Sequence, residues 1–180
     1  MSWSVRRCPC PCPISSSTRD VPINYVISFR RDQVGSVNGR FGTLDSVPIH
    51  YLDQTVPFHK MCALYRLADV AIITSLRDGM NLVSFEYVAC QRGKAEAGVL
   101  ILSEFAGAAQ SLGAGAICVN PWNTNRLADA LYHAIQMPVE ERNQLFNYAF
   151  QHVTQYTAQR WARQVCCAFF PFDPACTATS

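Results

Sequence analysis

The residues best suited to chemistry lie between Ser75 and Tyr87, where an apolar run enters a tight Asp-Gly turn and a helical pattern follows. Asn81 can cap that helix, which would leave the N–H groups of Leu82 and Val83 unpaired at the positive end of the helix dipole. Unpaired N–H groups at a helix start suit a diphosphate. The segment therefore predicts a phosphate-binding turn.

Carboxylates lie on both sides of this helix start. Gly79 would let the backbone approach a ligand closely, and Asp78 beside it could bind hydroxyls of a sugar. Glu86 follows Asn81 by roughly 7–8 Å along a helix axis, about the distance from a phosphate to a ribose, so it could bind two ribose hydroxyls. Each feature alone is more often structural, as a turn or as a charge on the helix dipole. Together they favour a sugar-nucleotide site as the hypothesis.

The surrounding pattern alternates strands with helices. Short apolar runs predict strands at 47–52, 70–74, 99–102 and 116–119, the last three buried on both faces. Helices are expected at 57–67, 82–91 and 157–170, and on either side of Pro138. This order predicts an α/β fold with a Rossmann-like, mostly parallel sheet.

Ligands of open parallel sheets bind beyond the carboxyl ends of the strands. The loops 53–58, 75–81 and 103–109 meet that condition and should share one edge of the sheet. In the last of them, Glu104 either lines the same crevice or caps the following helix. Trp122 and Trp161 are expected in the core or at a domain contact rather than at a ligand.

Composition limits the class of protein. With 180 residues, 49% hydrophobic and 16% charged, the chain is expected to pack as a globular protein. We expect residues 1–32 to be disordered or a non-family segment, 33–170 to form the binding domain, and 171–180 to be a tail. A net charge of +2 without a Lys/Arg run argues against nucleic-acid and membrane partners. Nine cysteines, an odd count, without an apolar leader predict reduced thiols and a cytoplasmic location.

Metal and nicotinamide chemistry are not indicated. The chain has no Cys-x-x-Cys pair, and its four histidines lack metal-ligand spacing. No Gly-x-Gly-x-x-Gly follows any predicted strand, which argues against a nicotinamide-binding domain.

The sequence also resembles a known family. Short sequence motifs that match the family occur in the same order at residues 37–44, 47–50, 63–65, 77–83, 86–91, 102–110 and 119–124. In these motifs the chain is similar to the C-terminal, donor-binding half of the trehalose-6-phosphate synthases, which form glycosyltransferase family 20. The resemblance implies one half of a two-domain GT-B fold and a retaining transfer of glucose from UDP-glucose to glucose-6-phosphate, which gives α,α-trehalose-6-phosphate and UDP. It implies no cofactor and no metal, in keeping with the absence of an Asp-x-Asp motif.

When the family's binding residues are transferred by position, the resemblance implies which residues of this chain bind UDP-glucose. Asp78 would bind glucose hydroxyls, and Glu86 the ribose. The remaining contacts would come from the backbone: Gly79, Met80 and Asn81 to the sugar, Leu82 and Val83 to the diphosphate, and Val56 to the uracil.

Other parts of the family's site have no match here. The Arg and Lys that clamp the diphosphate lie upstream of the matched region, and Arg30, Arg31 and Arg40 are expected on the surface instead. The glucose-6-phosphate domain is also unmatched, so that partner is expected only if the missing domain is supplied. We therefore expect this polypeptide alone to be inactive as a synthase. The alternative is a non-catalytic donor-domain remnant or a regulatory subunit of a synthase complex.

Overall fold

The structure, a computed structural model, describes residues 23–169, and their side chains from 31 to 167. The predicted tail and most of the predicted disordered start therefore lie outside the described residues. The chain divides into two compact units, residues 1–57 and 58–180. This division differs from the boundary at residue 33 that the sequence suggested.

The first unit contains one described helix, α1 (Ile23–Phe41), which begins inside the segment expected to be disordered or outside the family. The strand predicted at 47–52 is not formed. Instead, the Asn38 side chain donates to the carbonyl of Ile49 and accepts from its N–H, both at 2.9 Å. A side chain thus takes the place of a neighbouring strand, and Pro48 has no N–H to offer one.

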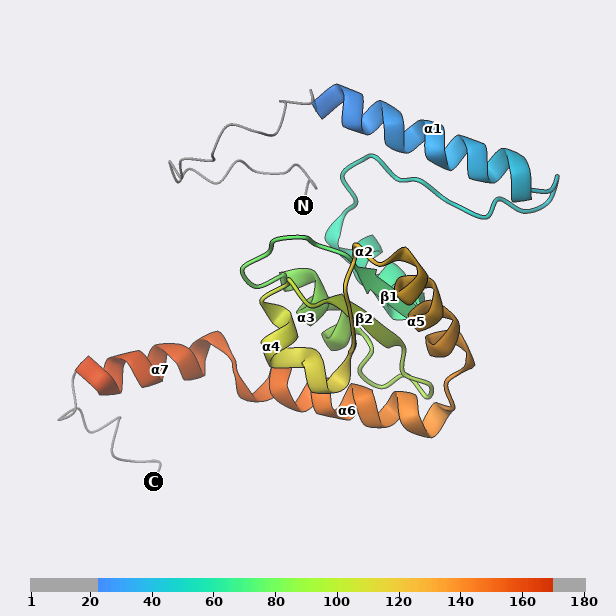
Figure 1. The fold of residues 1–180 in the computed structure, drawn as a ribbon. Helices are drawn as coiled ribbons and strands as arrows, with labels where there is room; N and C mark the ends of the chain where they lie inside the picture. Colours follow the sequence, from blue (N-terminus) through green and yellow to red (C-terminus); the bar gives the residue numbers. More distant parts are fainter. Residues whose placement is uncertain (1–22, 170–180) are drawn as a thin grey trace. The chain divides into compact units, whose positions relative to one another are not determined.

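The second unit is built on a parallel sheet, which confirms the predicted α/β class. Its strands are β1 (Val70–Ile73), β2 (Val99–Ser103) and β3 (Ile117–Val119), in the order β1-β2-β3. Pairing is parallel throughout, so all three strands end at the same edge of the sheet (Figure 1). That edge is where the sequence placed the site.

The helices of the second unit alternate with its strands along the chain, as predicted. They are α2 (Phe58–Leu67), α3 (Leu82–Cys90), α4 (Ala108–Leu112), the short 3-10 helix η1 (Gly113–Gly115), α5 (Thr124–Gln136), α6 (Val139–Gln155) and α7 (Ala158–Phe169). The helices predicted at 57–67, 82–91 and 157–170 are confirmed to within a residue or two, and Pro138 separates α5 from α6 as expected.

The two faces of the sheet have separate hydrophobic clusters because side chains alternate along β2. Leu100 and Leu102 pack with residues of α3, α4 and α6, whereas Val99 and Ile101 pack with Ala130 and other residues of α5. In Figure 1, α5 accordingly covers one face of the sheet and α6 the other. The sheet is therefore a packed layer between helices, as in Rossmann-like folds.

Only the central strand is buried on both faces as predicted. All of β2 is buried, but Ile72 in β1 is 43% exposed, and Cys118 in β3 is also exposed. The prediction was wrong for these two residues because an apolar run does not distinguish a central strand from an edge strand. Trp122 and Trp161 are exposed too, so they are not core residues of this structure.

Among the described residues, no helix is long and apolar enough to cross a membrane. The thiols of Cys62, Cys90, Cys118 and Cys166 are free. Cys167 is disulfide-bonded, an exception to the predicted reduced state.

Candidate functional site

Two of the three predicted loops meet beyond the ends of the strands. The N–H of Gly107 donates to the carbonyl of Asp78 at 2.8 Å, and Asp78 pairs with Ala106 as a parallel bridge. The loop after β1 is thereby joined to the loop after β2. The remaining loop, 53–58, spans the boundary between the compact units, so the role of the half-buried Val56 stays a prediction.

The carboxylate of Asp78 organises the turn in which it lies. One oxygen accepts from the N–H of Asn81 at 2.8 Å and from that of Met80 at 3.2 Å. The other accepts from the side-chain amide of Asn81 at 2.7 Å. A carboxylate has about four acceptor positions, so most of those on Asp78 are already used within the turn. The sequence predicted a ligand contact here and missed this structural role.

Asn81 caps α3, as predicted. Its side-chain oxygen accepts from the N–H of Ser84 at 3.1 Å, and the Ser84 hydroxyl donates back to its carbonyl at 2.6 Å. Asn81 has a φ of 61° and a ψ of 79°, in the left-handed region. Asparagine tolerates this conformation better than most residues because its short amide can bond locally.

The capping leaves two backbone donors free at the start of α3. Within the described part of the chain, no hydrogen bond reaches the N–H of Leu82 or Val83. The first turn of α3 also carries no acidic side chain that would offset the positive end of the helix dipole. The arrangement can accept an anion, as the spacing predicted.

Glu86 is half-buried on α3, and no hydrogen bond or ion pair among the described residues occupies its carboxylate. The hydroxyl of Tyr65, on α2, is buried and has no hydrogen-bond partner among the described residues. Burial first, and the Glu86 charge second, raise the pKa of Tyr65 above 10.0. In contrast to Asp78, Glu86 keeps its full acceptor capacity for a ligand.

The two loops touch through a pair of glycines. A Cβ on Gly107 would lie 2.0 Å from the carbonyl oxygen of Gly79, which no packing tolerates. A Cβ on Gly79 would meet nothing within 4 Å. Gly107 is thus needed for the contact between the loops, a role that the sequence analysis did not predict, whereas Gly79 leaves open space beside the turn.

Glu104 is exposed in the loop after β2. The N-cap of α4 is Gly107, and α4 has no side-chain cap, so the capping alternative for Glu104 is excluded for this helix. The backbone N–H of Glu104 donates to the carbonyl of Val119 at 3.0 Å, which ties this loop to the end of β3. The alternative that its side chain lines the crevice stays a prediction.

The arginines considered for the site have other roles in the first unit. Arg31 pairs with Asp53 at 2.7 Å, and the Arg40 guanidinium lies 5.2 Å from the ring centre of Phe41. These are the surface roles expected for them. The side chain of Arg30 lies outside the described side chains.

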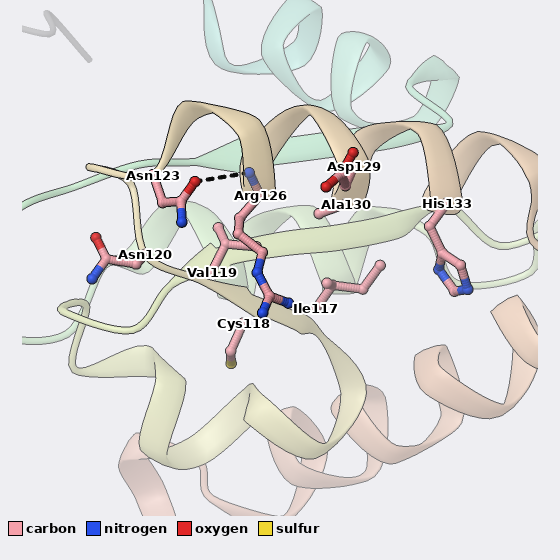
Figure 2. A pocket seen from close by; sticks show the side chains of 9 residues that line it. All are labelled: Ile117, Cys118, Val119, Asn120, Asn123, Arg126, Asp129, Ala130 and His133. Atoms are coloured by element: carbon pink, nitrogen blue, oxygen red, sulfur yellow. Dashed lines mark hydrogen bonds between the residues drawn. The ribbon is translucent and has the colours of Figure 1, made fainter.

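A separate pocket of about 450 Å³ lies between β3 and α5 (Figure 2). It is lined by Ile117, Cys118, Val119, Asn120, Asn123, Arg126, Asp129, Ala130 and His133. None of the predicted binding residues lines it, so it is distinct from the start of α3. Within residues 23–169, no group of three or more His, Cys, Asp or Glu side chains is placed to hold a metal ion.

Known proteins with a similar sequence share one activity in their names. Alpha,alpha-trehalose-phosphate synthase (UDP-forming) 1 of Arabidopsis thaliana is 62% identical over 129 residues, which cover 72% of this chain and 14% of that protein. The corresponding synthase of Candida albicans is 48% identical over 141 residues, 78% of this chain and 29% of the relative. The chain thus spans well under a third of the length of these relatives.

Solved structures agree with the sequence relatives. The crystal structure of an alpha,alpha-trehalose-phosphate synthase (UDP-forming) from Burkholderia vietnamiensis matches with a TM-score of 0.75 at 39% identity, over 81% of this chain and 32% of that chain. A structure from E. coli, bound with UDP-2-fluoro glucose, matches with a TM-score of 0.76 at 35% identity, over 84% of this chain and 34% of the other. The predicted fold class, part of a GT-B glycosyltransferase, is confirmed by these likenesses.

The family model described as glycosyltransferase family 20 matches residues 14–169, which include α1 and every described element of the second unit. The predicted resemblance is thereby confirmed, and the chain belongs to glycosyltransferase family 20.

Proposed function

We propose that this chain carries the donor-binding half of a retaining glucosyltransferase. The reaction moves glucose from UDP-glucose to glucose-6-phosphate and gives α,α-trehalose-6-phosphate and UDP. One observation carries the proposal: the start of α3 offers two free N–H donors, with the unpaired carboxylate of Glu86 further along the same helix. A diphosphate and a ribose need those two kinds of group at that spacing.

The names of the related proteins support UDP-glucose and glucose-6-phosphate as the two substrates. The relatives are UDP-forming, and the E. coli structure holds UDP-2-fluoro glucose. A structure from Burkholderia xenovorans is a complex with glucose-6-phosphate. In the proposal, glucose-6-phosphate binds outside the matched region, and residues 33–170 form the UDP-glucose domain.

Each predicted binding residue has a role in the proposal. The N–H groups of Leu82 and Val83 hold the diphosphate, and Glu86 accepts from the ribose hydroxyls. Asp78 shapes the turn and offers its remaining lone pair to a glucose hydroxyl, while the backbone of Gly79, Met80 and Asn81 borders the sugar. The backbone around Val56 contacts the uracil.

In the proposed chemistry, the start of α3 binds the UDP leaving group. As the glycosidic bond breaks, negative charge develops on the diphosphate of UDP, and preorganised N–H donors stabilise it more strongly than water does. The proposal includes no metal ion, and it places the protein in the cytoplasm, as the sequence predicted.

Calorimetric titration of the folded chain with UDP tests the proposal. Glu86→Ala removes hydrogen bonds to a charged acceptor, each about 1.5–3 kcal/mol, so the Kd for UDP should rise by at least about tenfold. Glu96→Ala, which removes an exposed acid from the loop before β2, is the matched control and should leave the Kd unchanged. A folded chain that binds no UDP would contradict the donor site. Equal affinities of the Glu86 variant and the wild type would contradict the role of Glu86 alone.

A further inference from the structure

Ser84 places a buried hydroxyl in the first turn of α3. The residue is 0% exposed, although Leu82 at the same end of the helix is 58% exposed. A buried hydroxyl needs a hydrogen-bond partner. Among the described residues, the partner that the Ser84 hydroxyl has is the carbonyl of Asn81, at 2.6 Å. Because it is buried and already bonded, this hydroxyl is not available to a ligand.

The hydrogen bond from Ser84 fixes the direction of one peptide group. The peptide bond between Asn81 and Leu82 is trans, so the N–H of Leu82 points opposite to the carbonyl of Asn81. Ser84 holds that carbonyl toward the first turn of α3. The N–H of Leu82 is thereby aimed outward, ahead of the helix, and it is one of the two free donors at the helix start.

The hydroxyl acts separately from the helix cap. The cap is the hydrogen bond from the N–H of Ser84 to the side-chain oxygen of Asn81 at 3.1 Å, and it does not use the hydroxyl. The same N–H lies 3.3 Å from the Asn81 carbonyl, so it is shared between two acceptors and holds the carbonyl less firmly than the hydroxyl does. Asn81, with a φ of 61°, keeps a conformation that a residue other than glycine holds only where its surroundings fix it.

We propose that Ser84 is a positioning residue of the donor site, which aims the N–H of Leu82 at the diphosphate of a uridine diphosphate ligand. The inference rests on the proposed function of the α3 start. Ser84 acts through the backbone of Asn81 and touches neither the ligand nor the reacting atoms. Its loss should therefore weaken the contact with the diphosphate and leave the proposed contacts of Glu86 with the ribose in place.

NMR titration of the folded chain with UDP and with uridine tests the proposal, because the shifts of backbone amide resonances report weak as well as tight binding. Ser84→Ala removes the hydroxyl and keeps the N–H that makes the cap. We expect the Kd for UDP to rise about three- to tenfold, the effect of one neutral hydrogen bond. The Kd for uridine, which has no diphosphate, should stay unchanged.

Two further variants control for packing and for the loss of a hydroxyl as such. Ser84→Cys, kept reduced, fills nearly the same space with a weaker donor, so it should also raise the Kd for UDP and not that for uridine. Thr154→Ala removes a hydroxyl that donates to the carbonyl of Phe150 at 3.0 Å on α6. It should leave both Kd values unchanged.

The outcomes separate this inference from the function on which it rests. If the wild type binds UDP and the folded Ser84 variants bind it equally well, the positioning role is overturned and the donor site stands. If the variants lose affinity for UDP and uridine by the same factor, the role is overturned too, because the loss is then general. A folded wild type without affinity for UDP would contradict the proposed function, and this inference with it.

Discussion

Asp78 and Asn81 act as one hydrogen-bonded unit at the start of α3. Asn81 gives Asp78 both its backbone N–H and its side-chain amide, and the oxygen of the same amide caps the helix. Each predicted residue is therefore where the sequence placed it, but the contact between them was not predicted. A motif identified from ligand chemistry does not reveal that a carboxylate is largely satisfied by its own turn.

Asn81→Ala is expected to lower the free energy of unfolding by about 2–4 kcal/mol. The loss combines a helix cap, about 1 kcal/mol, with the bond to Asp78 and the cost of placing alanine in the left-handed region. Asn123→Ala is the matched control, because Asn123 caps α5 through the N–H of Arg126 at 3.0 Å and has a negative φ of −95°. It should cost only about 1 kcal/mol. Urea unfolding measures both, and equal losses would contradict the special role of Asn81.

At the scale of helices and strands, the sequence predicted those features that depend on the local order of apolar and polar residues. The buried run of β2 and the break between helices at Pro138 are as expected. The failures depend on neighbours that a local pattern does not specify. The run at 47–52 has the composition of a strand but pairs with a side chain. Ile72 lies on an edge strand of the described sheet and is exposed for that reason.

The contact between the two site loops predicts opposite outcomes for two glycines. Gly107→Ala forces a Cβ against the carbonyl of Gly79, so it should destabilise the fold by about 1–3 kcal/mol and displace the loops. Gly79→Ala meets open space, so it should leave the free energy of unfolding within about 0.5 kcal/mol of wild type. Urea unfolding of the pair is the measurement. A tolerated Gly107→Ala would show that the loops are not in contact.

The packing of α3 against the sheet predicts a loss of stability at alkaline pH. Burial first, and the Asp69 carboxylate second, raise the pKa of Tyr87 well above 10.0, while Arg142 acts in the opposite direction. The folded state therefore binds the phenolic proton more tightly than the unfolded chain. This contribution is fully present below pH 10 and is lost as the pH rises above it toward the folded pKa.

Urea unfolding between pH 8 and about 11, in the presence of a reductant, measures this loss. Tyr87→Phe should show a shallower decline than wild type, because no phenol is left to ionise at that position. Its stability at pH 8 should be lower by about 1 kcal/mol, since its hydroxyl donates to the carbonyl of Ala68 at 3.3 Å. Tyr148→Phe, at an exposed position of α6, serves as the control. Identical alkaline profiles for wild type and Tyr87→Phe would exclude the effect.

At the scale of the whole molecule, the chain corresponds to a part of its relatives. It spans 14% of the Arabidopsis protein and 32% of the Burkholderia vietnamiensis structure. The matched sequence motifs predicted the family. They also predicted the parallel sheet, after whose first strand α3 begins. They did not predict the division into two compact units at residue 57.

The purified chain is expected to form no trehalose-6-phosphate from UDP-glucose and glucose-6-phosphate. Because the proposal places glucose-6-phosphate outside the matched region, transfer by these residues alone should lose the proximity contribution, which amounts to roughly 7–11 kcal/mol of the barrier. Chromatography of the sugar phosphates, with a full-length synthase as the positive control, is the measurement. Product formed by the chain alone, and lost in Glu86→Ala, would disprove this expectation.

The hydrogen bonds around Asp78 also bear on how the protein ages. An Asp-Gly sequence is prone to isomerise, because the backbone nitrogen of the glycine can attack the aspartyl carboxyl group and form a cyclic imide. Here the carboxylate accepts from the N–H groups of Met80 and Asn81 and from the Asn81 side-chain amide, all of which follow Gly79 in the chain. During storage, isoaspartate should therefore accumulate at Asp78 more slowly in the folded chain than in urea. The same turn that shapes the proposed sugar site thus protects its own backbone from chemical damage.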